Sequence, residues 1–181
     1  TSLAPARYQW RIDLAAPEIS FVQIDPQLAV TSQNAISFAF ASNETSHFEC
    51  ALDNEMYTAC ASPAVFSNLN EGSHAFHVSA IDVAANQSQT LDYLWTVDLT
   101  VPAVLLGNIV PQTGVTNASQ ASVEFSANET ATFYCSVDGS VATVCSSPFA
   151  TSFFNEGPHT ISIYAKDQAG NSSDAVSVNW V

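Results

Sequence analysis

Residues 17–96 and 102–181 are two copies of one sequence unit, offset by 85 residues. The alignment needs no gap, and 29 of its 80 positions are identical. A repeat of this length predicts that both copies adopt the same fold, so the chain is explained by one unit of about 85 residues used twice. The identical positions include Cys50 and Cys135, Cys60 and Cys145, Glu44 and Glu129, His74 and His159, Asp82 and Asp167, Asn86 and Asn171, and Trp95 and Trp180.

The same offset divides the whole chain. It places Trp10 on Trp95, so that "YQWRIDLAAP" at 8–17 matches "YLWTVDLTVP" at 93–102. We therefore expect residues 1–15 to be the last strand or linker of a preceding repeat, 16–100 to be the first repeat, and 101–181 to be the second. The chain then reads as part of a longer array, with neighbouring repeats of the same chain as partners. The link at 99–102 contains no Gly/Ser-rich spacer, which favours a semi-rigid rod.

The apolar residues of each unit alternate with a period of two, which is typical of β-strands. Turn signals separate these runs, among them Asp53-Asn54, Asp138-Gly139 and Ala169-Gly170-Asn171. About seven short strands per unit predict an all-β chain of two tandem Ig-like antiparallel β-sandwiches. The expected core faces are Ile36, Phe38 and Phe40; Phe48, Cys50 and Leu52; Phe76, Val78 and Ala80; and in the second unit Val123 and Phe125; Phe133, Cys135 and Val137; Ile161, Ile163 and Ala165.

Each unit carries one pair of cysteines in the spacing C-x9-C. This spacing differs from that of zinc sites, and no cationic residue lies beside the thiols to favour redox chemistry. The sequence therefore predicts one disulfide in each repeat, Cys50 with Cys60 and Cys135 with Cys145. Such disulfides indicate an extracellular or cell-surface location, because the cytosol is reducing.

The turn before the second cysteine poses a geometric question. If Asp138-Gly139 is a two-residue hairpin turn, Ala142 lies opposite Cys135, three residues short of Cys145. Either the chain bends after the hairpin and leads to Ser147-Pro148, or the loop is longer and centred near position 140. In the first case the bridge does not join directly opposed residues, whereas a loop centred near 140 would place the two cysteines opposite one another.

The charge excludes two classes of partner. The chain has 17 acidic and 3 basic residues and a formal net charge of −14. Binding to nucleic acid or to anionic lipid needs Lys and Arg, so neither partner is expected. No apolar run is long enough to insert this segment into a membrane.

Polar residues repeated in both units are the candidate site residues. His74 and His159 follow Glu-Gly at the start of a strand and have no partnered nucleophile, so we expect them to hold a loop backbone in place. Asp82 with Asn86, and Asp167 with Asn171, favour Asx-type turns; calcium, with Asp98 added at the junction, is the alternative. The sequence assigns no catalytic residue, cofactor or metal ligand. Tyr134 and Tyr164 lie on the outward phase of their strands and are the candidates for stacking on a sugar.

The patterns F-x-C-x-L/V-D-N/G, C-x-S-P and E-G-x-H-x-F/I-x-V/I-x-A-x-D-x-A-G/A-N, followed by Trp, occur in both units. In these motifs the chain resembles tandem Ig-like repeats of secreted and surface-anchored bacterial proteins, including adhesins. The resemblance implies a non-catalytic extracellular stalk, spacer or adhesion module that binds a protein or glycan ligand. The alternative is a carbohydrate-binding accessory region of a secreted enzyme. Asn54 and Ala85 replace glycines of the pattern, which predicts a shifted loop at Ala85.

Overall fold

The computed structural model describes residues 7–152 and 154–181. Its regular elements are all β-strands, and the described residues contain no helix that could cross a membrane. The chain divides into two compact units, one built from Thr1–Ala29, Ala35–Leu69 and Ser73–Thr96 and the other from Val30–Asn34, Asn70–Gly72 and Val97–Val181. The strands form two sandwiches, and the predicted fold class is confirmed.

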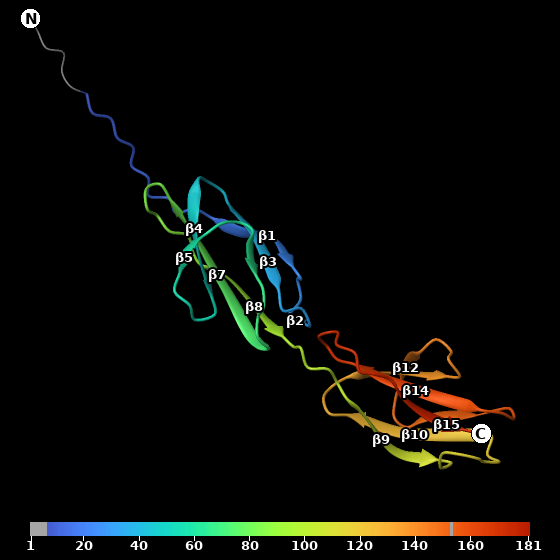
Figure 1. The fold of residues 1–181 in the computed structure, drawn as a ribbon. Coiled ribbons are helices and arrows are strands. Elements are labelled where there is room, and N and C mark those ends of the chain that lie inside the picture. Colours follow the sequence, from blue (N-terminus) through green and yellow to red (C-terminus); the bar gives the residue numbers. More distant parts are fainter. Residues whose placement is uncertain (1–6, 153) are drawn as a thin grey trace, which may run out of the picture. The chain divides into compact units, whose positions relative to one another are not determined.

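The first sandwich pairs a three-stranded sheet with a five-stranded one (Figure 1). The smaller sheet has the order β1-β3-β6 and the larger has the order β2-β8-β7-β4-β5. Antiparallel pairing joins β1 to β3 and β4 to β7. The strands are β1 (Ile19–Asp25), β2 (Val30–Thr31), β3 (Ile36–Ser42), β4 (Ser46–Leu52), β5 (Thr58–Cys60), β6 (Ala64–Phe66), β7 (Gly72–Asp82) and β8 (Leu91–Val97).

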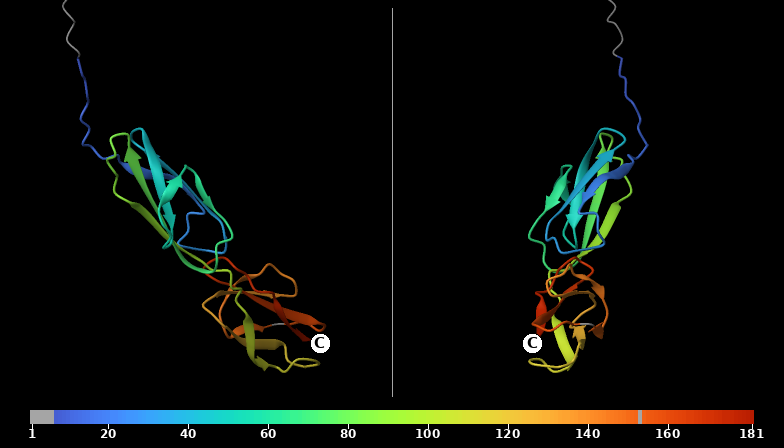
Figure 2. Two further views of the ribbon diagram at one scale, coloured as in Figure 1. Left: turned by 60° about the vertical axis from the view of Figure 1, so that its left-hand side comes forward. Right: turned by 90° about the vertical axis from the view of Figure 1, so that its right-hand side faces the viewer.

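The second sandwich repeats this plan. Its sheets have the orders β13-β10-β9 and β12-β11-β14-β15. Two views of the ribbon show the two sheets of each sandwich facing one another (Figure 2). The strands are β9 (Val104–Val110), β10 (Gln120–Ala127), β11 (Thr132–Val137), β12 (Thr143–Cys145), β13 (Phe149–Ser152), β14 (His159–Lys166) and β15 (Val176–Trp180).

The alternating apolar residues fill the space between the sheets, as their period of two requires. In the first sandwich Phe38, Phe76 and Val78 are completely buried, and in the second Val123, Ile161 and Ile163 are. Trp95 and Trp180 are buried with them, so each closing Trp belongs to its core. Trp10, which aligns with both, is 78% exposed on the segment before β1.

Each sandwich contains one disulfide, as the sequence predicts. Cys50 is bonded to Cys60 and Cys135 to Cys145, and the Cα atoms of each pair are 5.8 Å apart. In the second repeat Cys135 lies opposite Thr143, so its sulfur reaches Cys145 two residues further along β12 on the same face. The hairpin thus contains one residue more than a two-residue turn allows, and β12 runs straight beside β11 as far as Cys145.

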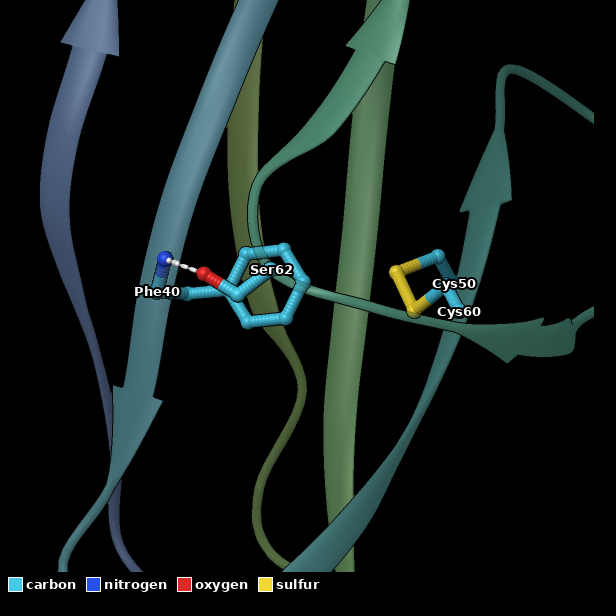
Figure 3. Close-up of a disulfide and its surroundings, with 4 residues drawn as sticks. All are labelled: Phe40, Cys50, Cys60 and Ser62. Carbon is cyan, nitrogen blue, oxygen red and sulfur yellow. Dashed lines mark hydrogen bonds between the residues drawn. A yellow bond between two sulfur atoms is a disulfide. The ribbon is translucent and has the colours of Figure 1, made fainter.

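The predicted bend follows directly after the second cysteine. β5 pairs with β4 in the larger sheet, whereas β6 pairs with β3 in the smaller one, so the chain changes sheets between Cys60 and Ala64. At the crossing Phe40 donates its backbone N–H to the Ser62 hydroxyl at 2.9 Å (Figure 3). Phe125 and Ser147 make the same bond at 2.8 Å in the second repeat. The disulfide fixes the segment before the crossing to the larger sheet, and this hydrogen bond fixes the segment after it to the smaller sheet.

The loop at Ala85 is shifted less than the sequence predicts. We expected it to be shifted, because the pattern has glycine there and the second repeat has Gly170. Ala85 instead keeps the left-handed conformation, with φ of 67°, as Gly170 does with φ of 101°. Hydrogen bonds from the loop to Asp82 keep Ala85 in this conformation, although positive φ is strained for a residue with a Cβ atom.

Candidate functional site

Three carboxylates meet at an equivalent place in each repeat. Asp13, Glu44 and Asp82 form the first acidic cluster, and Asp98, Glu129 and Asp167 form the second. In each cluster, one carboxylate oxygen from each residue lies within 4.8 Å of the other two. The three positions are related by the same offset of 85 residues as the repeats themselves.

Three separate segments supply each cluster. In the first, Asp82 is the last residue of β7, Glu44 lies in the turn between β3 and β4, and Asp13 lies on the segment before β1. In the second, Asp167 directly follows β14, Glu129 lies between β10 and β11, and Asp98 precedes β9. Each cluster therefore lies where the incoming chain meets a turn and the end of a long strand.

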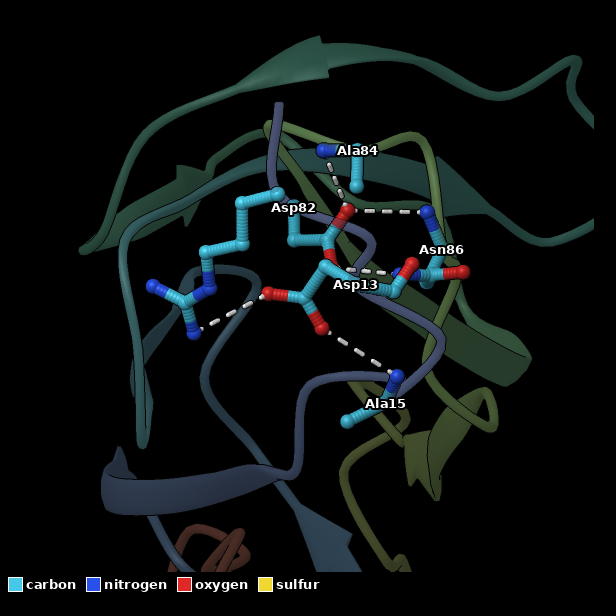
Figure 4. Close-up of polar contacts among 6 residues, drawn as sticks. Asp13, Ala15, Asp82, Ala84 and Asn86 are labelled. Atoms are coloured by element: carbon cyan, nitrogen blue, oxygen red, sulfur yellow. Dashed lines mark hydrogen bonds and ion pairs between the residues drawn. The ribbon is translucent and has the colours of Figure 1, made fainter. Parts of the chain in front are cut away.

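The loop after β7 is built around the buried carboxylate of Asp82 (Figure 4). Its Oδ1 accepts the backbone N–H groups of Ala84 and Asn86, both at 2.8 Å, and its Oδ2 accepts Nδ2 of Asn86 at 2.9 Å. Led by the hydrogen bond from the Asn86 side chain, these donors lower the pKa of Asp82. The amide of Asn86 also donates to the backbone carbonyl of Asp13 at 3.1 Å, which holds the incoming segment.

The second repeat has the same network with one donor shifted, because Gly170, which aligns with Ala85, donates where Ala84 does in the first repeat. Asp167 Oδ1 accepts the N–H groups of Gly170 and Asn171 at 2.7 and 2.8 Å, and Oδ2 accepts Nδ2 of Asn171 at 2.8 Å. Asn171 also donates to the carbonyl of Asp98 at 2.8 Å. The Asx-type turns expected from the sequence are therefore present, and they also anchor the backbone of the third cluster residue.

The sequence interpretation found half of these residues. It singled out Asp82, Asp167 and Asp98, but it passed over Glu44, Glu129 and Asp13. The signal was the repeat itself, because Glu44 matches Glu129 and Asp13 matches Asp98 between the two copies. Their convergence depends on strand topology, which residue spacing does not encode.

The repeated histidines tie each hairpin turn to the neighbouring strand. His74 Nδ1 lies 2.9 Å from Asp53 Oδ2, and His159 Nδ1 lies 2.8 Å from Asp138 Oδ2. His159 Nε2 also contacts the carbonyl of Asn155 at 2.8 Å. The loop-holding role expected of these histidines matches these contacts.

The pair of His159 and Asp138 predicts a pH dependence. Its hydrogen bond is the main cause that raises the pKa of His159 above 6.5 and lowers that of Asp138 below 3.8. A raised histidine pKa stabilises the fold below the unfolded value, and this contribution is lost as pH rises through the folded value; a lowered aspartate pKa stabilises it above the unfolded value. The pair therefore contributes most between pH about 4 and 6.5.

Replacing Asp138 with Asn is expected to lower the pKa of His159 and to remove this pH dependence from the unfolding of the second repeat. The measurement is an NMR titration of the His159 ring together with thermal unfolding at pH 5 to 8. Asp92→Asn is the control, because Asp92 pairs with the unrepeated His77 at 2.6 Å. An unchanged His159 pKa in Asp138→Asn would contradict the assignment.

The two outward-facing tyrosines stack on one another. Tyr134 and Tyr164 are opposed across β11 and β14 and stack with ring centroids 4.9 Å apart and an angle of 7° between the planes. Both are half-buried, and each covers one face of the other. The first repeat has Glu49 and Ser79 at these positions, so this aromatic pair belongs to the second repeat alone.

Comparisons with known proteins agree on the fold. Residues 111–177 match the family model described as chitobiase/beta-hexosaminidase C-terminal domain. The fibronectin(III)-like modules of Clostridium thermocellum CbhA are similar in structure, with a TM-score of 0.52 and 17% identity over 90% of this chain and 93% of that one. The central fibronectin-III array of RIM-binding protein aligns with a TM-score of 0.30 and 12% identity over 90% of this chain and 67% of that one, too low to support an argument. No curated protein matches. The chain is a tandem β-sandwich repeat of Ig-like and fibronectin III type.

Proposed function

We propose that this chain is a non-catalytic extracellular segment that acts as a stalk, spacer or adhesion module of a larger bacterial surface or secreted protein. Residues 16–100 and 101–181 are its two repeats, and residues 1–15 belong to the last strand or linker of a preceding one. Each repeat adds one domain length between an anchor and a distal binding site.

One observation carries this proposal: the same sandwich occurs twice, and each copy has its own core, disulfide and closing Trp. A unit that is complete in itself can be added in series without a change in its fold. The matched family and the fibronectin III-like modules are typically accessory, non-catalytic domains, which supports a role beside other domains. The disulfides support an oxidising compartment.

The net charge of −14 fits an extended extracellular segment. Like charge on neighbouring molecules opposes their association and keeps such rods soluble. It also disfavours polyanionic ligands, which leaves neutral glycans and basic protein surfaces as the preferred ligand classes.

The alternative function is a carbohydrate-binding accessory region of a secreted enzyme. The matched family is named for chitobiase and β-hexosaminidase, which favours chitin and its oligosaccharides as probes. The stacked pair of Tyr134 and Tyr164 offers one outer aromatic face in the second repeat. A sugar ring would stack on that outer face, since the inner faces already contact one another.

Retention on chitin beads and binding to a glycan array separate the two functions. For a stalk or spacer we expect no saturable binding by the intact chain, and for an adhesion module any binding should survive Tyr134→Ala and Tyr164→Ala. Saturable binding that is lost in Tyr134→Ala and Tyr164→Ala would replace the stalk with the accessory region. Tyr57→Ala is the matched control, because Tyr57 is an exposed tyrosine of the first repeat, away from this pair.

A further inference from the structure

Glu129 has a buried oxygen that the protein does not satisfy. Its Oε1 exposes less than 1 Å² and has no hydrogen-bond partner among the described residues. Burial and the nearby carboxylates of Asp98 and Asp167 raise the pKa of Glu129. A buried carboxylate oxygen without a donor is costly, so this position calls for a proton or a cation.

Among the described residues, no Lys or Arg side chain forms an ion pair with Glu129. The chain has only three basic residues, Arg7, Arg11 and Lys166. Among the described residues the only Lys or Arg ion pair joins Arg11 to Asp13, at 3.6 Å in the first cluster. The second cluster therefore gathers three carboxylates without a Lys or Arg ion pair, a charge distribution that a bound metal ion would neutralise.

The distances suit direct coordination. Ca²⁺ binds oxygen ligands at about 2.3–2.6 Å, so two ligands on opposite sides of one ion are separated by about 4.6–5.2 Å. The carboxylate oxygens of each cluster lie within 4.8 Å of one another, inside that limit. Oδ1 of Asp82 and of Asp167 already accepts two hydrogen bonds, whereas Oδ2 accepts one and keeps a second lone pair for a metal.

We propose that each repeat binds one calcium ion, held in the second repeat by Asp98, Glu129 and Asp167 and in the first by Asp13, Glu44 and Asp82. Hard carboxylate ligands without Cys or His favour calcium over zinc. Ligands from three separate segments suit the flexible geometry of calcium better than the strict octahedron of magnesium. The proposal does not depend on the function proposed above.

The site has a structural consequence within each unit. Asp13 and Asp98 lie on the segments that lead into β1 and β9, where the side-chain amides of Asn86 and Asn171 donate to their backbone carbonyls. Calcium would add a bond from the same residue to the adjacent turn and strand end. The second site is the tighter of the two, because Arg11 already neutralises part of the charge of Asp13.

Isothermal titration calorimetry of the intact chain, stripped of metal and held in 0.15 M NaCl, tests the proposal with CaCl₂ as the probe. We expect two calcium ions per chain for the wild type, one for Glu129→Gln, one for Glu44→Gln and none for the double variant. In a chelator Glu129→Gln should unfold at the same or a higher temperature than wild type, because it removes repulsion. In calcium it should unfold at a lower temperature. This reversal separates lost binding from a damaged fold.

Glu55→Gln is the matched control, since Glu55 is an exposed glutamate outside both clusters. It should leave both sites and both unfolding temperatures unchanged. The proposal fails if calcium gives no saturable heat, if Glu129→Gln keeps two sites, or if Glu55→Gln loses binding to the same extent. It also fails if MgCl₂ binds with equal affinity, since the choice of calcium would then be wrong.

Discussion

Removing the disulfide from either repeat is expected to lower the free energy of unfolding of that repeat by about 3 kcal/mol. The variants are Cys50→Ala with Cys60→Ala, and Cys135→Ala with Cys145→Ala. Each bridge closes a short loop, with a sequence separation of 10, and so restricts the unfolded chain. A domain of about 85 residues has a stability of roughly 4–13 kcal/mol, so this loss is a large share of the total.

Calorimetry of the chain in urea measures the unfolding transition of each repeat. The double variant of one repeat should lower only its own transition, because the other keeps its bridge. Dithiothreitol on the wild type should reproduce both losses, and on each variant it should affect only the remaining bridge. A loss below about 1 kcal/mol in both variants would mean that the hairpins are already ordered in the unfolded state.

Much of the fold could be predicted because a period of two reports directly which side chains share a face. Ile36, Phe38 and Phe40 were expected on one face, and all three are buried. The disulfides could be predicted for a different reason: two copies of the unit carried the same spacing independently. The repeat thus served as an internal control on the interpretation of each copy.

The register of the hairpin could not be fixed in this way. A two-residue turn at Asp138-Gly139 would place Ala142 opposite Cys135, but Thr143 lies there. One extra residue is accommodated between the turn and β12, and such an offset leaves no trace in the apolar pattern of a three-residue strand. At Ala85 the hydrogen bonds from Ala84 and Asn86 to Asp82, all within one loop, outweigh the preference of a non-glycine residue against positive φ.

The acidic clusters show the limit of spacing arguments. Asp82 and Asn86 are four residues apart, so their loop could be inferred from local turn chemistry. Glu44 and Asp13 reach Asp82 only because β3, β4 and β7 lie in a particular order, and in sequence both look like ordinary polar turn residues. Retention of a charged residue between two diverged repeats was the available signal for such convergence.

The two repeats fill the same fold with different side chains. In the first, Phe38 stacks on Phe76 with the ring centroids 4.2 Å apart. Its centroid lies 5.5–6.2 Å from those of Phe66, Tyr93 and Trp95. The second repeat has Val123 and Ile161 at the positions of Phe38 and Phe76, and both are completely buried. The first core is therefore aromatic where the second is aliphatic.

Phe38→Ala is accordingly expected to destabilise the first repeat by about 3–5 kcal/mol, whereas Val123→Ala should cost the second about 2 kcal/mol. The larger loss follows from the number of ring contacts that disappear and from the cavity that rigid aromatic neighbours cannot close. Phe38→Val, which installs the side chain of the second repeat, should be destabilising as well, because the surrounding rings are packed against a ring. Calorimetry of the intact chain measures all three variants. Equal losses for Phe38→Ala and Val123→Ala would show that the first core relaxes around the cavity, and that its aromatic contacts contribute no more than the area they bury.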